Sequence, residues 1–402
     1  MKTYKKRPVY LEKIRPFMDQ DIIKVLIGQR RVGKSYIFFQ LIDELKIQFG
    51  VQDQQIIFIN KELHEFDHIQ DYKDLLAYIK THTTQTKTYV FIDEIQDITQ
   101  FEKALRDLQA LGGYDIYISG SNATMLSSEI ATYLTGRYIE FEIFPLTYPE
   151  FLDFHSRTHS KDTFLEYMKF GGLPYLKHLV LEEEIVYDYL KSIYNTIILK
   201  DVVARYSVRN VDFLDRLVEF LSDTMGSLST ANNISKYLKS QKIDMGTNVI
   251  LEYIHHLCSV YLINKVKRKD VIGKKIFEIN DKYYFSDLGI RNILVGGYRQ
   301  TDIGKILENI VYLHFKTHGY TIYVGKYKEK EIDFVVEKNG KIMYIQVAYL
   351  ITSPETQARE FDNLIQIQDN YEKIVLSMDD FIDGDYKGVK HYNLVDYILH
   401  YS

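Results

Sequence analysis

The chain has 402 residues, of which 46% are hydrophobic and 26% are charged, and its formal net charge is −5 at pH 7. This composition predicts a folded globular protein and excludes a disordered chain. The small net charge excludes nucleic-acid binding through overall charge, so any such contact needs a local basic face. At this length, two or three domains are expected.

The single cysteine, Cys258, excludes an intrachain disulfide and a cysteine-rich zinc site. The basic segment MKTYKKRPVY at the amino end lacks the apolar stretch that follows in a signal peptide. No later segment approaches the ~20 apolar residues that span a bilayer. We therefore expect a cytoplasmic protein with no membrane partner.

In the first 147 residues, short β-branched runs alternate with amphipathic helical segments. Strands are predicted at 22–27, 56–60, 89–93, 114–120 and 137–146, and helices at 36–49, 71–80 and 101–111. This alternation predicts an α/β fold in which helices cover both faces of a parallel sheet.

The rest of the chain divides into three regions by pattern. Residues 148–223 are helical apart from FGGLPY, and we expect a helical lid there. Residues 224–280 read as two helices, at 233–240 and 248–263, followed by a basic, strand-like segment. Helix, turn, helix and basic hairpin is the outline of a winged helix. Residues 281–402 mix helices with strands, and the NG dipeptide within them predicts a tight hairpin.

The stretch GQRRVGKS lies between the first strand and the first helix and satisfies the phosphate-loop (P-loop) pattern. Its two glycines let backbone amides point at phosphates, Lys34 supplies a cation, and Ser35 offers a hydroxyl to Mg²⁺. The positive end of the next helix adds to the attraction. The residues expected to contact the nucleotide are Gly28, Gln29, Arg30, Arg31, Val32, Gly33, Lys34, Ser35 and Tyr36.

The apolar strand YVFID ends in an acidic pair, Asp93 and Glu94. We expect Asp93 to hold Mg²⁺ and Glu94 to polarise the attacking water. GTPases more often position that water with a glutamine, so the acidic pair favours ATP. The alternative is that both residues cap the next helix.

Two further polar residues complete the expected site. Asn122, or alternatively Ser121, follows the strand YDIYISG and is placed to sense the γ-phosphate, although an N-cap would look the same. Arg137 follows the helix predicted in LSSEIATYL and is a candidate arginine finger towards a neighbouring subunit, which would imply a homo-oligomer. The alternative is an ordinary surface or packing arginine.

The set GQRRVGKS, VFIDEIQDI, ISGSNA, LTGRYIEFEIFPLTYPEF and FGGLPY resembles a prokaryotic family of AAA-type P-loop ATPases. Members of that family carry a winged helix and a C-terminal domain similar to restriction endonucleases of the PD-(D/E)xK type. The resemblance covers most of the chain. It implies an ATPase core at 1–147, a lid at 148–223, a winged helix at 224–280 and a degenerate nuclease-like domain at 281–402.

Nucleases of that type bind Mg²⁺ through an acid on a helix and an Asp on a strand, and a Glu-x-Lys follows on the next strand. Here Glu308 matches the helix acid and Asp333 matches the strand Asp, but Gln346 and Ala348 stand where Glu and Lys belong. We therefore expect the fold of a nuclease without its catalytic activity. The two acids would form hydrogen bonds within the core or pair with nearby lysines. An unusual metal site that includes Glu331 is the alternative.

Basic residues gather in the region of the predicted winged helix. The ones expected to contact DNA lie on its basic strand and are Lys265, Lys267, Arg268 and Lys269, and Lys236, Lys239 and Lys242 add charge nearby. A recognition helix would start near Thr247 and Asn248, although Glu252 and the apolar majority of that helix favour packing.

The motifs together predict an ATPase that uses ATP and Mg²⁺ as a nucleotide-driven switch or motor on DNA. An adaptor or sensor that binds nucleotide and recognises a protein partner is the second hypothesis. A metal-dependent nuclease coupled to the ATPase is the third.

Overall fold

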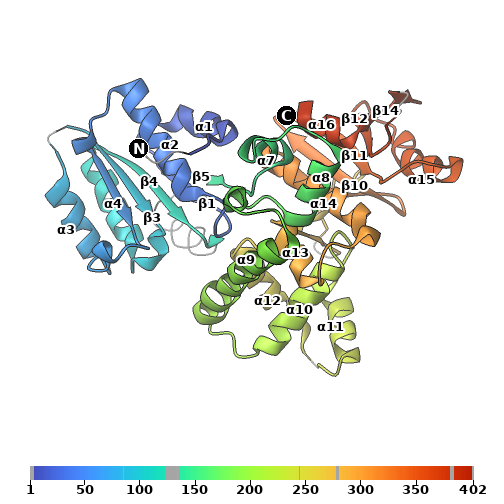
Figure 1. The fold of residues 1–402 in the computed structure, drawn as a ribbon, viewed down its shortest axis with the longest axis horizontal. Helices are drawn as coiled ribbons and strands as arrows, with labels where there is room; N and C mark the ends of the chain where they lie inside the picture. The colour runs from blue at the N-terminus through green and yellow to red at the C-terminus, as the bar shows by residue number, and fades with distance from the viewer. Residues whose placement is uncertain are drawn as a thin grey trace. The chain divides into compact units, whose positions relative to one another are not determined.

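The computed structural model describes residues 4–84, 86–123, 134, 136–243, 245–277, 280–380 and 384–400 (Figure 1). The chain forms two compact units. The first comprises Met1–Phe144 with Ser259–Tyr261, and the second comprises Pro145–Cys258 with Leu262–Ser402. The helix predicted in LSSEIATYL lies almost entirely outside the described residues.

The first unit is built on a parallel sheet with strand order β2-β3-β4-β1-β5. Its strands are β1 (Ile23–Ile27), β2 (Ile56–Asn60), β3 (Thr88–Asp93), β4 (Tyr114–Gly120) and β5 (Tyr138–Glu142). Its helices are α1 (Pro8–Ile14), α2 (Lys34–Phe49), α3 (Tyr72–His82) and α4 (Phe101–Leu111), with 3-10 turns at Arg15–Phe17, Asp53–Gln55, His64–Phe66 and Ile95–Asp97. The predicted α/β fold of this region is confirmed.

Helices cover both faces of this sheet, which is why its strands are apolar on both sides. Every residue of β3 is buried. Val90 and Ile92 pack in one core with residues of α3 and α4, whereas the ring of Phe91 lies 5.4 Å from that of Phe38 on α2. Side chains alternate between the two faces, as the period of a strand requires. The carboxyl ends of the strands and the start of α2 are thereby fixed together.

The second unit contains most of the helices. They are α7 (Tyr148–Phe154), α8 (Lys161–Phe170), α9 (Glu183–Thr196), α10 (Val211–Asp223), α11 (Ala231–Ser240), α12 (Thr247–Ser259), α13 (Leu288–Leu294), α14 (Ile303–Thr317), α15 (Pro354–Ile365) and α16 (Leu394–His400). A π-helical segment, Ile197–Ala204, continues α9, and 3-10 turns lie at Pro174–His178 and Gln300–Asp302. The second helix of the predicted winged helix ends at Ser259, four residues earlier than the sequence suggests, because a strand begins at Ile263.

Two sheets complete the second unit. The larger has the order β13-β14-β12-β11-β10-β9-β7, and the smaller is the antiparallel pair β6-β8. The strands are β6 (Ile263–Val266), β7 (Arg268–Asp270), β8 (Lys282–Phe285), β9 (Thr321–Tyr327), β10 (Lys330–Lys338), β11 (Lys341–Val347), β12 (Glu372–Ser377), β13 (Asp385–Tyr386) and β14 (Val389–Asn393). The hairpin predicted at the NG dipeptide joins β10 to β11, and both Asn339 and Gly340 have positive φ, as a type I′ turn requires.

The basic segment is divided between the two sheets, and its second part also turns back as a short hairpin. There the amide of Phe277 donates to the carbonyl of Arg268 and the amide of Asp270 to the carbonyl of Lys275, each at 2.8 Å. The first part of the segment, β6, pairs with β8, and its second part, β7, pairs in parallel with β9. The backbone of β7 therefore forms hydrogen bonds with β9, and β7 is the edge strand of the larger sheet. This arrangement differs from a wing that stands free in solvent.

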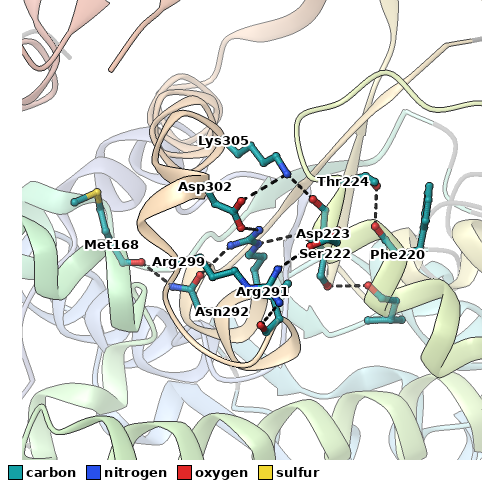
Figure 2. Close-up of polar contacts among 12 residues, drawn as sticks. Met168, Phe220, Ser222, Asp223, Thr224, Arg291, Asn292, Arg299, Asp302 and Lys305 are labelled. Atoms are coloured by element: carbon teal, nitrogen blue, oxygen red, sulfur yellow. Dashed lines mark hydrogen bonds and ion pairs between the residues drawn. The ribbon is translucent and has the colours of Figure 1, made fainter. Parts of the chain in front are cut away.

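A buried polar cluster links elements that are far apart in the sequence of the second unit (Figure 2). Arg291 on α13 is fully buried, and its guanidinium donates to the carbonyl of Ser222 at 3.0 Å and to Asp302. The amide of Asn292 donates to the carbonyl of Met168 at 2.9 Å. A buried arginine requires such partners, and their loss would leave an uncompensated charge. The helices assigned to the lid and the C-terminal region thus share one core.

The FGGLPY segment joins the same core through close backbone approach. The amide of Gly172 donates to Oδ2 of Asp287 at 2.8 Å. A Cβ on Gly172 would lie 2.3 Å from the carbonyl oxygen of Leu146, and one on Gly289 would lie 2.1 Å from that of Phe170. Both positions therefore require glycine for steric reasons.

Candidate nucleotide-binding site

The loop between β1 and α2 has a backbone that needs its glycines. Gly28 has φ +143°, and a Cβ there would lie 2.2 Å from the carbonyl oxygen of Ile143. Gly33 has φ +96° and occupies the N-cap position of α2, which begins at Lys34. The loop is thus held tightly against the sheet and leads directly into the positive end of a helix, which is suited to an anion.

Lys34 lies inside this loop. Its side chain is buried, and its ammonium donates to the carbonyl of Gly28 at 2.9 Å and to that of Gln29 at 3.1 Å. The lysine therefore contacts main-chain carbonyls here. Its positive charge is directed to the centre of the loop, where a phosphate would need it.

Asp93, at the carboxyl end of β3, lies beside Ser35. Its carboxylate accepts hydrogen bonds from the hydroxyls of Ser119 and Ser35 and is almost fully buried. Burial raises the pKa of Asp93 above its ordinary value, against the lowering effect of these bonds and of Lys34. The structure thus brings together the two residues assigned to Mg²⁺. A cation would relieve the burial of this charge.

Glu94 follows in a left-handed backbone conformation, with φ 56°. Such a conformation is uncommon for residues other than glycine and occurs often at functional sites. Burial acts to raise the pKa of Glu94, but Lys34 and Arg30, together with hydrogen bonds, lower it below the ordinary value. The side chain is consequently a carboxylate at neutral pH, which is the form a general base requires.

Two side chains hold this carboxylate. Oε2 of Glu94 accepts a hydrogen bond from the hydroxyl of Ser121 at 3.2 Å and another from the amide of Gln96. Ser121 was the second choice for the residue at the end of β4, and Asn122, the first choice, is buried beside it. Gln96 was missed by the sequence reasoning, although it stands only two residues after Glu94.

The other loop residues differ in exposure. Gln29 is buried, and its amide atoms have no hydrogen-bond partner among the described residues. Arg30 lies 3.6 Å from Glu62. Val32 is buried, whereas Arg31 and Tyr36 are exposed.

Arg137 lies just before β5 and is exposed. Its carbonyl accepts hydrogen bonds from the backbone of Ile23 and the side chain of Gln109, each at 3.0 Å. Within the described part of the chain, no contact joins its guanidinium to Lys34 or Glu94.

In the second unit, the structure brings Glu308 and Asp333 together around the ammonium of Lys282. Gln346 lies next to them, because its Oε1 accepts from the amide of Asp333 at 3.4 Å, while its own amide donates to Glu360 at 3.1 Å. Among the residues that the structure describes, no group of three or more His, Cys, Asp or Glu side chains is arranged to hold a metal ion.

Ion pairs neutralise part of the basic segment. Lys265 lies 2.8 Å from Asp281, and Lys269 pairs with Glu337. Lys267 is exposed, and Nε of Arg268 is buried without a hydrogen-bond partner among the described residues. The cations left for a phosphate are therefore Lys267 and Arg268.

Comparison with known families identifies the first unit. Residues 20–152 match the family described as an AAA domain. Residues 161–301 match a domain of unknown function (DUF8612), and residues 303–394 match another (DUF4143). The first unit is therefore a P-loop domain of the AAA type, the nucleotide-binding fold of ATPases. No helix in the described ranges is both long and apolar enough to cross a membrane.

Two curated relatives align with most of the chain. An uncharacterized protein of Haemophilus influenzae is 36% identical over 400 residues, which is 98% of each chain. The uncharacterized protein MJ1544 of Methanocaldococcus jannaschii is 31% identical over 368 residues, covering 86% of this chain and 79% of the relative.

Similar solved structures are more distant. The Walker-type ATPase of Pyrococcus abyssi has 14% identity and a TM-score of 0.49, covering 73% of this chain and 96% of that chain. The ORC2 protein of Aeropyrum pernix has 10% identity and a TM-score of 0.42, covering 76% and 91%. Both lie below the similarity at which a shared fold can be inferred.

Proposed function

This chain belongs to the family of the Haemophilus influenzae and Methanocaldococcus jannaschii proteins, and we propose that its AAA-type unit binds and hydrolyses ATP with Mg²⁺. The observation that carries the proposal is the convergence of three parts at one edge of the sheet. They are the loop cation Lys34, the pair Ser35 and Asp93, and the ionised Glu94.

The residues present fit a magnesium nucleotide. A Cβ at Gly28 would meet the carbonyl oxygen of Ile143 at 2.2 Å, so glycine lets the loop pack closely at this point. The loop then leads into the positive end of α2, which suits a phosphate. Ser35 and Asp93 supply the oxygen donors that Mg²⁺ prefers. When bound, Mg²⁺ neutralises charge that develops on the phosphates.

The chain's own residues then perform the remaining steps. Lys34 would exchange its bonds to loop carbonyls for phosphate oxygens, a stronger charge-assisted contact. Glu94 would accept a proton from the attacking water at its carboxylate. Because Ser121 and Gln96 occupy Oε2 of Glu94, we propose that these bonds restrain the base until nucleotide binding rearranges them.

The direct test compares Lys34→Ala with Lys46→Ala, a lysine near the other end of α2. We expect Lys34→Ala to lower ATP turnover on the order of 10²–10³-fold because it removes a charge that stabilises the transition state, and we expect Lys46→Ala to retain activity. Isothermal calorimetry with a slowly hydrolysed ATP analogue measures binding separately. Equal turnover by Lys34→Ala and wild type would refute the assignment.

DNA is proposed as the partner on the basis of Lys267 and Arg268, the two cations of the basic segment that lack a carboxylate partner among the described residues. Reversing both charges should weaken binding in a gel-shift assay. It should also reduce the slope of log affinity against log salt by about one for each contact removed. Lys265→Gln is the control, because that lysine is already paired with Asp281. Unchanged binding would remove this surface from the proposal.

Measuring ATP turnover with and without DNA separates the two remaining roles. Stimulation by DNA favours a switch or motor on DNA. If added DNA leaves ATP turnover unchanged, the result favours an adaptor or sensor that recognises a protein partner through its second unit.

Arg137 is proposed as an arginine finger that acts on a neighbouring copy, because it is exposed and contacts neither Lys34 nor Glu94 within the described residues. Arg137→Ala and Glu94→Gln proteins should each be inactive alone. Mixed oligomers should regain part of the turnover, since each copy supplies what the other lacks. No recovery in mixed oligomers would exclude action between subunits.

A further inference from the structure

Lys282 is a fully surrounded cation in the second unit. It lies on β8, and its side chain is 3% exposed. Its Nζ lies 2.7 Å from Oε1 of Glu308 on α14 and 2.8 Å from Oε1 of Glu331 on β10. It also lies 3.8 Å from Oδ1 of Asp333, two residues further along the same strand.

The contacts with Glu308 and Glu331 have the length of strong, charge-assisted hydrogen bonds, and Asp333 acts on Lys282 by electrostatic attraction. Burial acts to lower the pKa of Lys282, but attraction from Glu308, Asp333 and Glu331 raises it well above the ordinary value. The side chain is therefore an ammonium ion.

The carboxylates around Lys282 have further partners that hold them in place. The hydroxyl of Tyr284 donates to Oε1 of Glu308, and the amide of Val347 donates to Oδ2 of Asp333 at 2.8 Å. Burial and the charge of Glu308 raise the pKa of Asp333 well above its ordinary value, while Lys282 lowers it. The cluster of Glu308, Glu331 and Asp333, called here the acid cluster, thus needs positive charge.

Converging carboxylates commonly share a divalent cation, but with Lys282 in place no such group among the described residues is arranged to hold one. In this chain an ammonium ion stands between them, delivered by a strand that precedes the acids in the sequence. An ammonium and a metal ion would repel each other at such distances, so the two occupants exclude each other.

We propose that the acid cluster is a cation site whose permanent occupant is the ammonium of Lys282. It follows that the site takes up no divalent metal and performs no metal-dependent phosphodiester hydrolysis. Its role is to fasten β8 to α14 and β10. The inference is independent of the ATPase proposal, because it concerns different residues and a different unit.

The test measures thermal unfolding without nucleotide, in excess Mn²⁺ and in excess EDTA. The wild-type midpoint should be the same in both. Lys282→Met should unfold at a temperature lower by on the order of 10 °C in EDTA, because three acids lose their counter-charge. Mn²⁺ should recover much of this loss, since a bound ion stabilises the folded state. Lys265→Met, which removes a more exposed ion-paired lysine on β6, is the matched control and should not respond to Mn²⁺.

Glu331→Gln keeps the test decisive if Lys282→Met does not fold. A Mn²⁺-dependent shift of the wild-type midpoint that disappears in Glu331→Gln would place a metal in the acid cluster and overturn the proposal. A shift that persists unchanged in Glu331→Gln would come from another site and would support the proposal, because the acid cluster then takes up no metal. The proposal would also be overturned if wild-type protein cleaved DNA in Mn²⁺ and Glu331→Gln did not. A folded Lys282→Met protein whose unfolding midpoint did not respond to Mn²⁺ would overturn it as well.

Discussion

The P-loop site of the first unit and the acid cluster of the second contain similar groups but use them in opposite ways. Each brings carboxylates together near one buried lysine. In the first unit, Lys34 donates to two backbone carbonyls and acts on Asp93 and Glu94 by electrostatic attraction, which acts to lower the pKa of both. In the second, Lys282 bonds to the carboxylates themselves.

The difference teaches that the partner of the lysine decides whether a carboxylate is available for chemistry. A lysine that contacts neutral carbonyls can exchange them for phosphate at little electrostatic loss. A lysine bonded to several buried acids is held by strong attraction, and removing it leaves those charges uncompensated. The first arrangement suits a binding site, and the second suits a structural junction.

The largest expected effect comes from removing the proposed base. Glu94→Gln should lower ATP turnover by about 10²–10⁴-fold, because an amide does not accept the proton of the attacking water. Nucleotide affinity should change little, and calorimetry alongside a phosphate-release assay measures both. Glu12→Gln, which alters an exposed acid on α1, is the control. Retained turnover in Glu94→Gln would show that the carboxylate is not the base.

Asp287 extends the comparison to a buried carboxyl with backbone amides as its partners. Burial raises its pKa from 3.8 to about 6, although amides such as those of Ile290 and Gly172 lower it. Because the folded protein binds this proton more tightly than the unfolded chain, protonation of Asp287 favours folding. This contribution is about 3 kcal/mol and is fully present below pH 3.8. It is lost as the pH rises through about 6.

Asp287→Asn should therefore flatten the dependence of unfolding free energy on pH. The change between about pH 5 and about pH 7 should shrink by on the order of 1 kcal/mol, as measured by urea unfolding. Asp223→Asn, which alters an exposed acid paired with Arg299, should leave the slope as it is. A slope equal to that of wild type in Asp287→Asn would contradict the assigned pKa.

Gln96 tests how firmly Glu94 is restrained. Gln96→Ala removes one of the two hydrogen bonds to Oε2, which frees the carboxylate and makes it a stronger base. We expect basal ATP turnover to rise by about tenfold, which corresponds to the lower end of the value of one hydrogen bond to a charged group. Gln54→Ala, which alters an exposed glutamine in the 3-10 turn Asp53–Gln55, is the control. A fall in turnover would instead show that Gln96 orients the base.

The smallest effect is expected at the edge of the acid cluster. The side chain of Glu331 is 34% exposed, so water screens its attraction to Lys282. Glu331→Gln should cost about 1 kcal/mol or less of unfolding free energy, whereas Glu308→Gln should cost more, because Glu308 is more deeply buried. Chemical denaturation of both variants measures the difference. Equal losses would mean that burial does not set the strength of these contacts.

Local patterns were sufficient to predict the α/β fold and several of its elements. The strand, loop and helix around the P-loop could be read because each depends on residues close in sequence, and the NG hairpin followed from two residues that accept positive φ. Ser119 was missed because its contact with Asp93 arises only when β3 and β4 are placed side by side. Gln96 was missed because its contact with Glu94 depends on the left-handed backbone at Glu94, which the residue type does not indicate.

The sequence by itself determined the order of strands and helices in the first unit and the chemical types present in its loop, because hydrophobic period and glycine placement act locally. Only the tertiary structure decided where each lysine is directed. Lys282 precedes Glu308 by 26 positions and Asp333 by more, and no local rule connects them. Their contact depends on the packing of β8 against α14 and β10, since electrostatic attraction depends on distance in space and not on distance along the chain.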